Sequence, residues 1–105
     1  MAFADKRLEL DQILRDLLGS GNVYFQPSEN VRMSYPCIVY NRQNADSKFA
    51  NNKTYISCMR YQVSYIDSDP DSDFHIKMIE TFPMCVYTNH FVADNLNHEI
   101  FDLYF

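Results

Sequence analysis

The sequence predicts an α+β domain in which a mostly antiparallel sheet of about four strands is flanked by two helices, with one long hairpin loop. Helical periodicity occurs twice, near the start of the chain and again near residue 75. Runs rich in Tyr, Val and Ile lie between and after these helices. Helices and strands do not alternate regularly, which disfavours a parallel α/β sheet. At 105 residues, the chain (1–105) is expected to form a single domain.

The first helix is expected over residues 5–18. Apolar residues, among them Leu10 and Leu14, recur at spacings of three and four. Polar residues that include Asp11 and Arg15 are expected on the other side of this helix. A Gly-Ser-Gly segment follows it and should end it, because glycine takes the left-handed cap conformation at little steric cost.

Three strands are expected next. Residues 23–26 form a short aromatic strand, and residues 37–40 form a continuous β-branched and aromatic run typical of a buried strand. Residues 54–67 alternate, with apolar side chains on odd positions and wetter ones on even positions. The last two strands should pair antiparallel across the polar segment 42–53.

A second helix should begin with Asp69 as its N-cap and Pro70 as its first helical residue. Its apolar stripe runs to a proline that cannot continue it. Strands over 84–91 and 98–105, with residues 95–97 in the turn between them, complete the chain.

Charge is divided unevenly along the chain. The net charge is −5, but residues 1–66 carry +2 and residues 67–105 carry −7, with Lys77 their only base. The acidic balance disfavours a general nucleic-acid binder, which needs a basic field. No secretory h-region and no apolar run long enough to span a membrane is present, so no membrane partner is expected.

Three cysteines, Cys37, Cys58 and Cys85, lie in apolar strand-like segments without a paired spacing. They are interpreted as buried thiols of a reducing cytoplasm. There is no nucleophile motif and no phosphate-binding glycine loop, so no catalytic residue, metal ligand or cofactor is assigned.

Acidic residues alternate in the segment that precedes the second helix. They are Asp67, Asp69, Asp71 and Asp73. Read from Asp69, the spacing resembles a calcium loop, but Phe74 stands where the sharp turn requires glycine. Helix capping in a solvated loop is favoured, while a cation or partner contact and a two-metal enzyme site remain alternatives.

The polar segment 42–53 is much longer than an ordinary hairpin connection, and loops of this length are often functional. It is Asn-rich and contains one exposed-looking phenylalanine, which would suit insertion into a neighbouring subunit. The assembly candidates are Arg42, Asn44, Asp46, Lys48, Phe49, Asn51, Asn52 and Lys53.

Several segments together resemble the tail-completion (tail terminator) proteins of long-tailed bacteriophages. The resemblance covers roughly residues 8–105, and the order of YPCIVY, DPDS and DNLNH is its most specific feature. The segments that carry it are 19–27, 33–40, 50–52, 61–63, 66–72, 83–85 and 93–98, with Phe101, Leu103 and Tyr104.

The resemblance implies a structural role without catalysis. Family members form rings, typically hexamers, that cap the tail tube, end its polymerisation and join it to the head connector. The implied partners are other copies of the chain, the tail tube protein and a head-completion or connector protein. The protein would then belong to the neck of the virion, be assembled in the bacterial host cytoplasm, and let DNA pass without specific binding.

Three other interpretations remain open at the level of sequence. The chain could be another neck or tube subunit, or a regulatory binding module of the same phage. A small metal-dependent enzyme that uses the Asp67–Asp73 carboxylates is the alternative from a different class.

Overall fold

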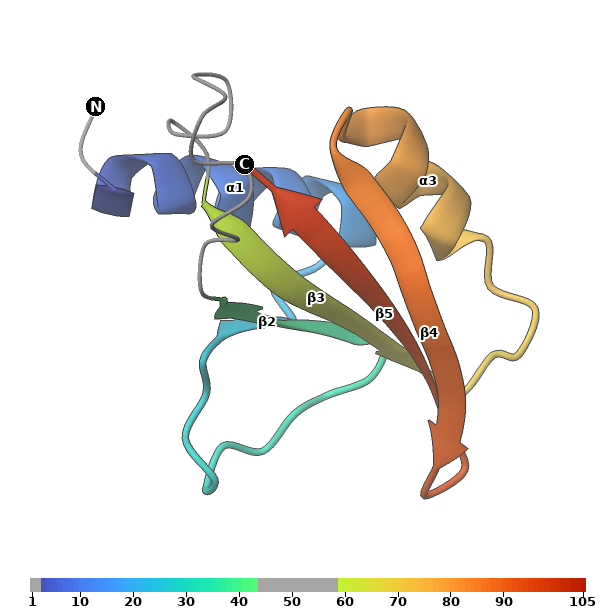
Figure 1. Ribbon diagram of the computed structural model, residues 1–105. Coiled ribbons are helices and arrows are strands. Elements are labelled where there is room, and N and C mark those ends of the chain that lie inside the picture. Colours follow the sequence, from blue (N-terminus) through green and yellow to red (C-terminus); the bar gives the residue numbers. More distant parts are fainter. Residues whose placement is uncertain (1–2, 44–58) are drawn as a thin grey trace.

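The computed structural model describes residues 3–43 and 59–105, and it confirms the predicted α+β class. Two helices and a five-stranded mixed sheet make up the described part of the chain (Figure 1). The elements in order are α1 (Phe3–Leu18), β1 (Val23–Phe25), β2 (Cys37–Arg42), β3 (Arg60–Asp67), α3 (Phe74–Thr81), β4 (Cys85–Ala93) and β5 (Leu96–Tyr104).

The strands lie in the order β1-β2-β3-β5-β4. Strands β2 and β3 pair antiparallel, with Tyr40 opposite Val63, as the sequence predicts. Strand β1 pairs parallel with β2, while β5 pairs antiparallel with both β3 and β4. The sheet therefore has five strands rather than about four, because the three-residue segment β1 joins it at one edge.

One face of the sheet carries both helices and the hydrophobic core. Leu10 and Leu14 of α1 are fully buried, as are Tyr61 and Val63 on the odd positions of β3. Phe74 and Met78 bring α3 into the same cluster. Figure 1 shows both helices behind the sheet, so its other face is not covered by a helix.

Helix α1 ends as predicted. The Gly19 N–H donates to Arg15 O at 2.9 Å, and Gly19 has a φ of 79°, which favours glycine. Neither helix of the described residues has the length and apolarity needed to cross a bilayer.

Helix α3 begins at Phe74, so the predicted start at Asp69 and Pro70 is wrong. The Asp67 and Asp69 carboxylates accept backbone N–H groups two residues further on, at 3.1 and 2.9 Å. These Asx turns hold residues 67–71 in a non-helical conformation, and Asp73 takes the N-cap position without a side-chain cap bond.

The turn between β4 and β5 lies one residue earlier than predicted. Asp94 and Asn95 have φ values of 53° and 63°, and Leu96 already belongs to β5. Two consecutive left-handed residues are typical of a two-residue hairpin turn whose twist matches that of the strands. The predicted turn over 95–97 is therefore too long and too late.

Candidate assembly interface

The acidic segment after β3 is a loop in which two of the four carboxylates, those of Asp67 and Asp69, accept hydrogen bonds from the protein itself. Asp67 Oδ2 accepts a hydrogen bond from the Tyr65 hydroxyl at 2.6 Å, and the Ser72 hydroxyl donates to the same Tyr65 oxygen at 3.3 Å. The Tyr65 ring stacks on Phe74, with ring centroids 4.1 Å apart. The loop is thus anchored to the core at both ends.

The outer acids of this loop face solvent. Asp69, Asp71 and Asp73 are exposed, and no group of three or more His, Cys, Asp or Glu residues in the described segments is arranged to hold a metal ion. Because two of the four carboxylates are engaged with backbone N–H groups, the loop presents negative charge to its surroundings rather than a convergent set of ligands.

Of the eight assembly candidates in segment 42–53, only Arg42 lies within the described residues; the other seven lie outside them. Arg42 is exposed at the end of β2, and its backbone N–H donates to Gln26 Oε1 at 3.1 Å. It pairs with Tyr61 at one end of β3, whereas Asp67 ends the same strand. Six residues of strand separate these ends by about 20 Å.

The sheet is therefore electrically polarised along β3. Arg42 and Arg60 lie at the end where β3 begins, and Arg60 forms an ion pair of 3.0 Å with Asp102 there. Asp67 to Asp73 lie at the other end, next to the β4–β5 turn with Asp94. Of the assembly candidates, Arg42, the one that the structure describes, therefore lies at the opposite end of β3 from the acidic candidates.

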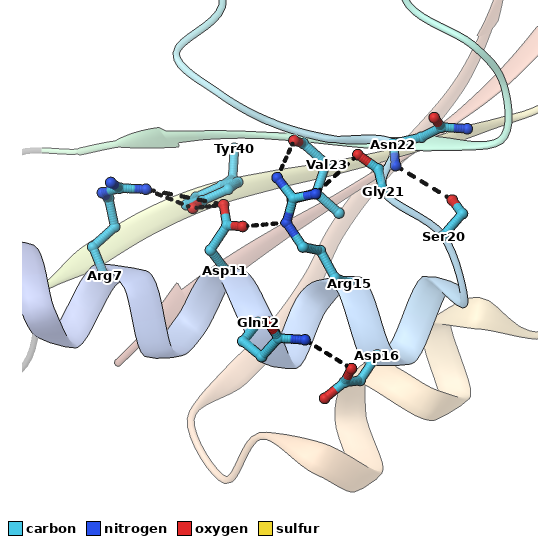
Figure 2. Close-up of polar contacts among 10 residues, drawn as sticks. All are labelled: Arg7, Asp11, Gln12, Arg15, Asp16, Ser20, Gly21, Asn22, Val23 and Tyr40. Atoms are coloured by element: carbon cyan, nitrogen blue, oxygen red, sulfur yellow. Dashed lines mark hydrogen bonds and ion pairs between the residues drawn. The ribbon is translucent and has the colours of Figure 1, made fainter.

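A polar network that the sequence analysis missed holds α1 against β1 and β2 (Figure 2). Asp11 accepts hydrogen bonds from the Tyr40 hydroxyl and from Arg15 Nε, and Arg7 also donates to the Tyr40 hydroxyl at 3.2 Å. Arg15 donates further to Gly21 O at 3.1 Å and to Val23 O at 3.4 Å.

The expectation that Asp11 lies away from the core is therefore wrong, whereas the Arg15 side chain is 40% exposed. The Asp11 side chain is only 14% exposed. Burial and the Asp11 hydrogen bond raise the pKa of the Tyr40 hydroxyl. A polar residue between two buried leucines at the border of the apolar stripe is the signal that could have predicted this.

Glu99 is a buried carboxylate that the sequence analysis did not single out. It is 9% exposed on the helix-covered face, where Tyr87 OH donates to Oε1 at 3.3 Å and His75 Nδ1 lies 3.7 Å away. Glu99 Oε2 is buried without a hydrogen-bond partner among the described residues. Its even spacing from buried Phe101 and Leu103 predicts this burial.

Of the three cysteines, Cys58 lies outside the described residues. Cys37 is buried and Cys85 half-buried, and burial raises the pKa of both thiols to about 11. Both thiols are therefore protonated at neutral pH, which makes them poor nucleophiles.

The open face of the sheet is hollowed by a shallow groove of about 590 Å³. Val39, Ile66 and Ile100 form its apolar floor, and Phe91 stacks on His98 at its rim with ring centroids 4.7 Å apart. A second, smaller and mainly apolar hollow of about 260 Å³ lies between α1 and the C-terminal end of α3, next to Phe105.

Comparison with known proteins adds no relative to this description: family models, curated proteins and solved structures were searched, and none matches the chain.

Proposed function

We propose that this protein is a structural subunit of a bacteriophage neck, a tail terminator that forms a ring on the finished tail tube. The observation that carries the proposal is the resemblance over residues 8–105. The YPCIVY motif includes the first four residues of β2, DPDS lies in the acidic loop, and DNLNH comprises the β4–β5 turn and the first residues of β5. The most specific motifs thus lie in a strand and in two connections at the acidic end of the sheet.

The polarised sheet supports a ring. A cyclic ring needs two different and complementary surfaces on each subunit, because its contacts are heterologous. A subunit with the exposed Arg42 at one end of β3, where Arg60 is paired with Asp102, and an acidic loop at the other end offers two unlike surfaces. The partners are other copies of the chain, the tail tube and a head-side connector, with DNA passing through the ring.

The test is deletion of residues 44–52 in a phage that carries this gene. We expect the shortened protein to retain a cooperative unfolding transition and the phage to accumulate separate heads and tails. An exchange of exposed Glu9 for Ala on α1 is the matched control and should leave joining intact. Joined particles from the deletion variant would refute the role of the loop, and labelled protein found away from the head–tail junction would refute the proposed function.

A further inference from the structure

Strand β4 leaves a long backbone edge that no described residue pairs with. It is the last strand in the sheet order and runs for nine residues, CVYTNHFVA. Natural edge strands are usually protected by charged residues, proline or short length. Strand β4 contains no Asp, Glu, Lys, Arg or Pro, and its remaining protection is a bulge between Tyr87 and Asn89.

The opposite edge of the sheet is protected. Strand β1 has only three residues, and the Arg15 guanidinium donates to the carbonyl of Val23 (Figure 2). The two edges therefore differ, because Arg15 of α1 binds the Val23 carbonyl at the short edge, whereas the long edge of β4 presents its polar backbone groups.

Exposed apolar side chains gather beside β4. Of eight large apolar residues that are exposed in the described part of the chain, five lie on β4 and the neighbouring helix α3. They are Ile76, Ile79, Val86, Phe91 and Val92. Exposed apolar side chains that flank an unpaired strand edge on both faces of the sheet indicate an interaction surface.

The hydrogen bonds of β5 define which β4 groups point outward. Phe105 exchanges two backbone hydrogen bonds with Met59. The backbone N–H and C=O groups of the odd residues of β5 therefore point toward β3, and those of the even residues point toward β4. Residues 86, 89 and 91, opposite even residues of β5, thus point inward. The N–H and C=O groups of residues 85, 87, 90 and 92 therefore point outward. One of these outward N–H groups, that of His90, donates a hydrogen bond to Asn89 Oδ1 at 2.8 Å.

We propose that β4 pairs antiparallel with β4 of a second copy, joining two sheets into one. In the register that places Cys85 opposite the second copy's Val92, Tyr87 stands opposite its His90. These are the four outward-facing positions, so each opposed pair can exchange two backbone hydrogen bonds. The His90 N–H would exchange its Asn89 acceptor for the second copy's Tyr87 carbonyl.

The side chains fit the same register. The bulge reverses the alternation, so Val86 and Phe91 both lie on the open face and stand opposite each other across the contact. Residues 85, 87, 90 and 92 share the helix-covered face. The two bulges meet on the symmetry axis, and the strand introduces no like-charge pair because it has no Asp, Glu, Lys or Arg.

Helix α3 adds apolar area to this contact. The His75 ring lies 5.6 Å from the Tyr87 ring, so the flank of α3 that carries His75 faces β4. Ile79, four residues later, lies on the same flank. It is 49% exposed, and the second copy's Val92, 62% exposed in the single chain, would lie beside it.

This contact is isologous and goes beyond the proposed ring, whose contacts are heterologous. An isologous contact closes after two copies and cannot extend into a filament. It describes the protein before assembly and does not depend on the phage role.

The first test is the mass of the full chain in solution, measured by light scattering over the micromolar range. We expect twice the 12.4 kDa of one chain for the wild type. Val92→Lys should weaken association at least about tenfold, because it places a charge at an uncharged contact twice per dimer. Leu8→Lys, at a similarly exposed position of α1, is the matched control and should associate like the wild type.

The second test fixes the register. Cα atoms of a non-hydrogen-bonded antiparallel pair are about 4.5 Å apart, within reach of a disulfide. The double variant Val86→Cys/Phe91→Cys should therefore form a covalent dimer on oxidation, while Val86→Cys alone should not. A wild type that stays monomeric, a dimer that Val92→Lys leaves unchanged, or a double variant that does not cross-link would overturn the β4 contact and leave the ring proposal standing.

Discussion

Asp11 illustrates how one carboxylate can hold a helix to a sheet. Its two oxygens accept from Tyr40 on β2 and from Arg15, which itself donates to the carbonyls before and within β1. We expect Asp11→Ala to lower the free energy of unfolding by roughly 2 kcal/mol, because it leaves a buried hydroxyl and an arginine without their charged acceptor. Urea unfolding would measure the loss. Asp16→Ala is the control: it removes only an exposed hydrogen bond from Gln12 and should change the free energy of unfolding by less than about 0.5 kcal/mol. Equal effects of the two variants would contradict the role of Asp11 in holding α1 to the sheet.

The buried tyrosines make the protein sensitive to alkali. Burial and the neighbouring Asp67 raise the pKa of Tyr65 from 10.0 to about 12, and burial also raises the pKa of Tyr40. Between pH 10 and about 12 the folded state holds protons that the unfolded state has lost, so stability is full below pH 10 and falls above it. Each such tyrosine contributes a slope of about 1.4 kcal/mol per pH unit. Unfolding curves at rising pH should show the loss, and Tyr65→Phe should reduce its slope; an unchanged slope would contradict the assignment.

At the scale of elements, the β4–β5 hairpin depends on two consecutive left-handed residues, Asp94 and Asn95. Asn tolerates this conformation better than most residues, and Gly tolerates it best. We expect Asn95→Ala to destabilise the protein by about 1 kcal/mol, while Asn95→Gly keeps or raises stability. Thermal unfolding of the two variants gives the comparison, and an Ala variant as stable as the Gly variant would show that the turn does not need a positive φ.

How far elements follow from sequence depends on whether their cause is local. The leucine stripe of α1 and the alternation of β3 are local patterns, and both are confirmed. The start of α3 is wrong because Asp can either cap a helix or close an Asx turn, and Asp67 and Asp69 do the second. The parallel pairing of β1 and the contact of Asp11 with Tyr40 join residues far apart in the chain, which local spacing cannot predict.

Only the parts of the candidate interface that have a local cause can be predicted from the sequence. The acidic loop is visible in the sequence as alternating Asp residues, and in the structure Asp69, Asp71 and Asp73 are exposed while Asp67 is half-buried. The open edge of β4 is not visible in the sequence, because a strand becomes an edge only through the order of all five strands. The alternation of β5 places Glu99 on the buried face, but its partners Tyr87 on β4 and His75 on α3 follow only from the folded structure.

At the scale of the whole molecule, the separation of charge along β3 predicts that the stability of the proposed ring depends on salt concentration. If the acidic loop of one subunit meets the basic end of its neighbour, salt should weaken the ring, because the Debye length shortens to about 10 Å at 0.1 M. If the loops instead line a common lumen, they repel one another and salt should strengthen it. The two ends lie about 20 Å apart on each subunit, so we expect the first outcome.

The double variant Asp71→Lys/Asp73→Lys tests this expectation. Both side chains are exposed, and neither is the acceptor of the Asx turns, which belong to Asp67 and Asp69. The exchange brings the net charge from −5 to −1 and should cost the fold no more than about 1 kcal/mol through the N-terminus of α3. Assembly of the variant on tail tubes can be measured by sedimentation at low and at high salt. We expect it to assemble less than the wild type at low salt. Glu9→Lys/Asp16→Lys makes the same change of charge on exposed positions of α1 and should assemble like the wild type, whereas stronger assembly of the loop variant would identify the loops as neighbours around the lumen.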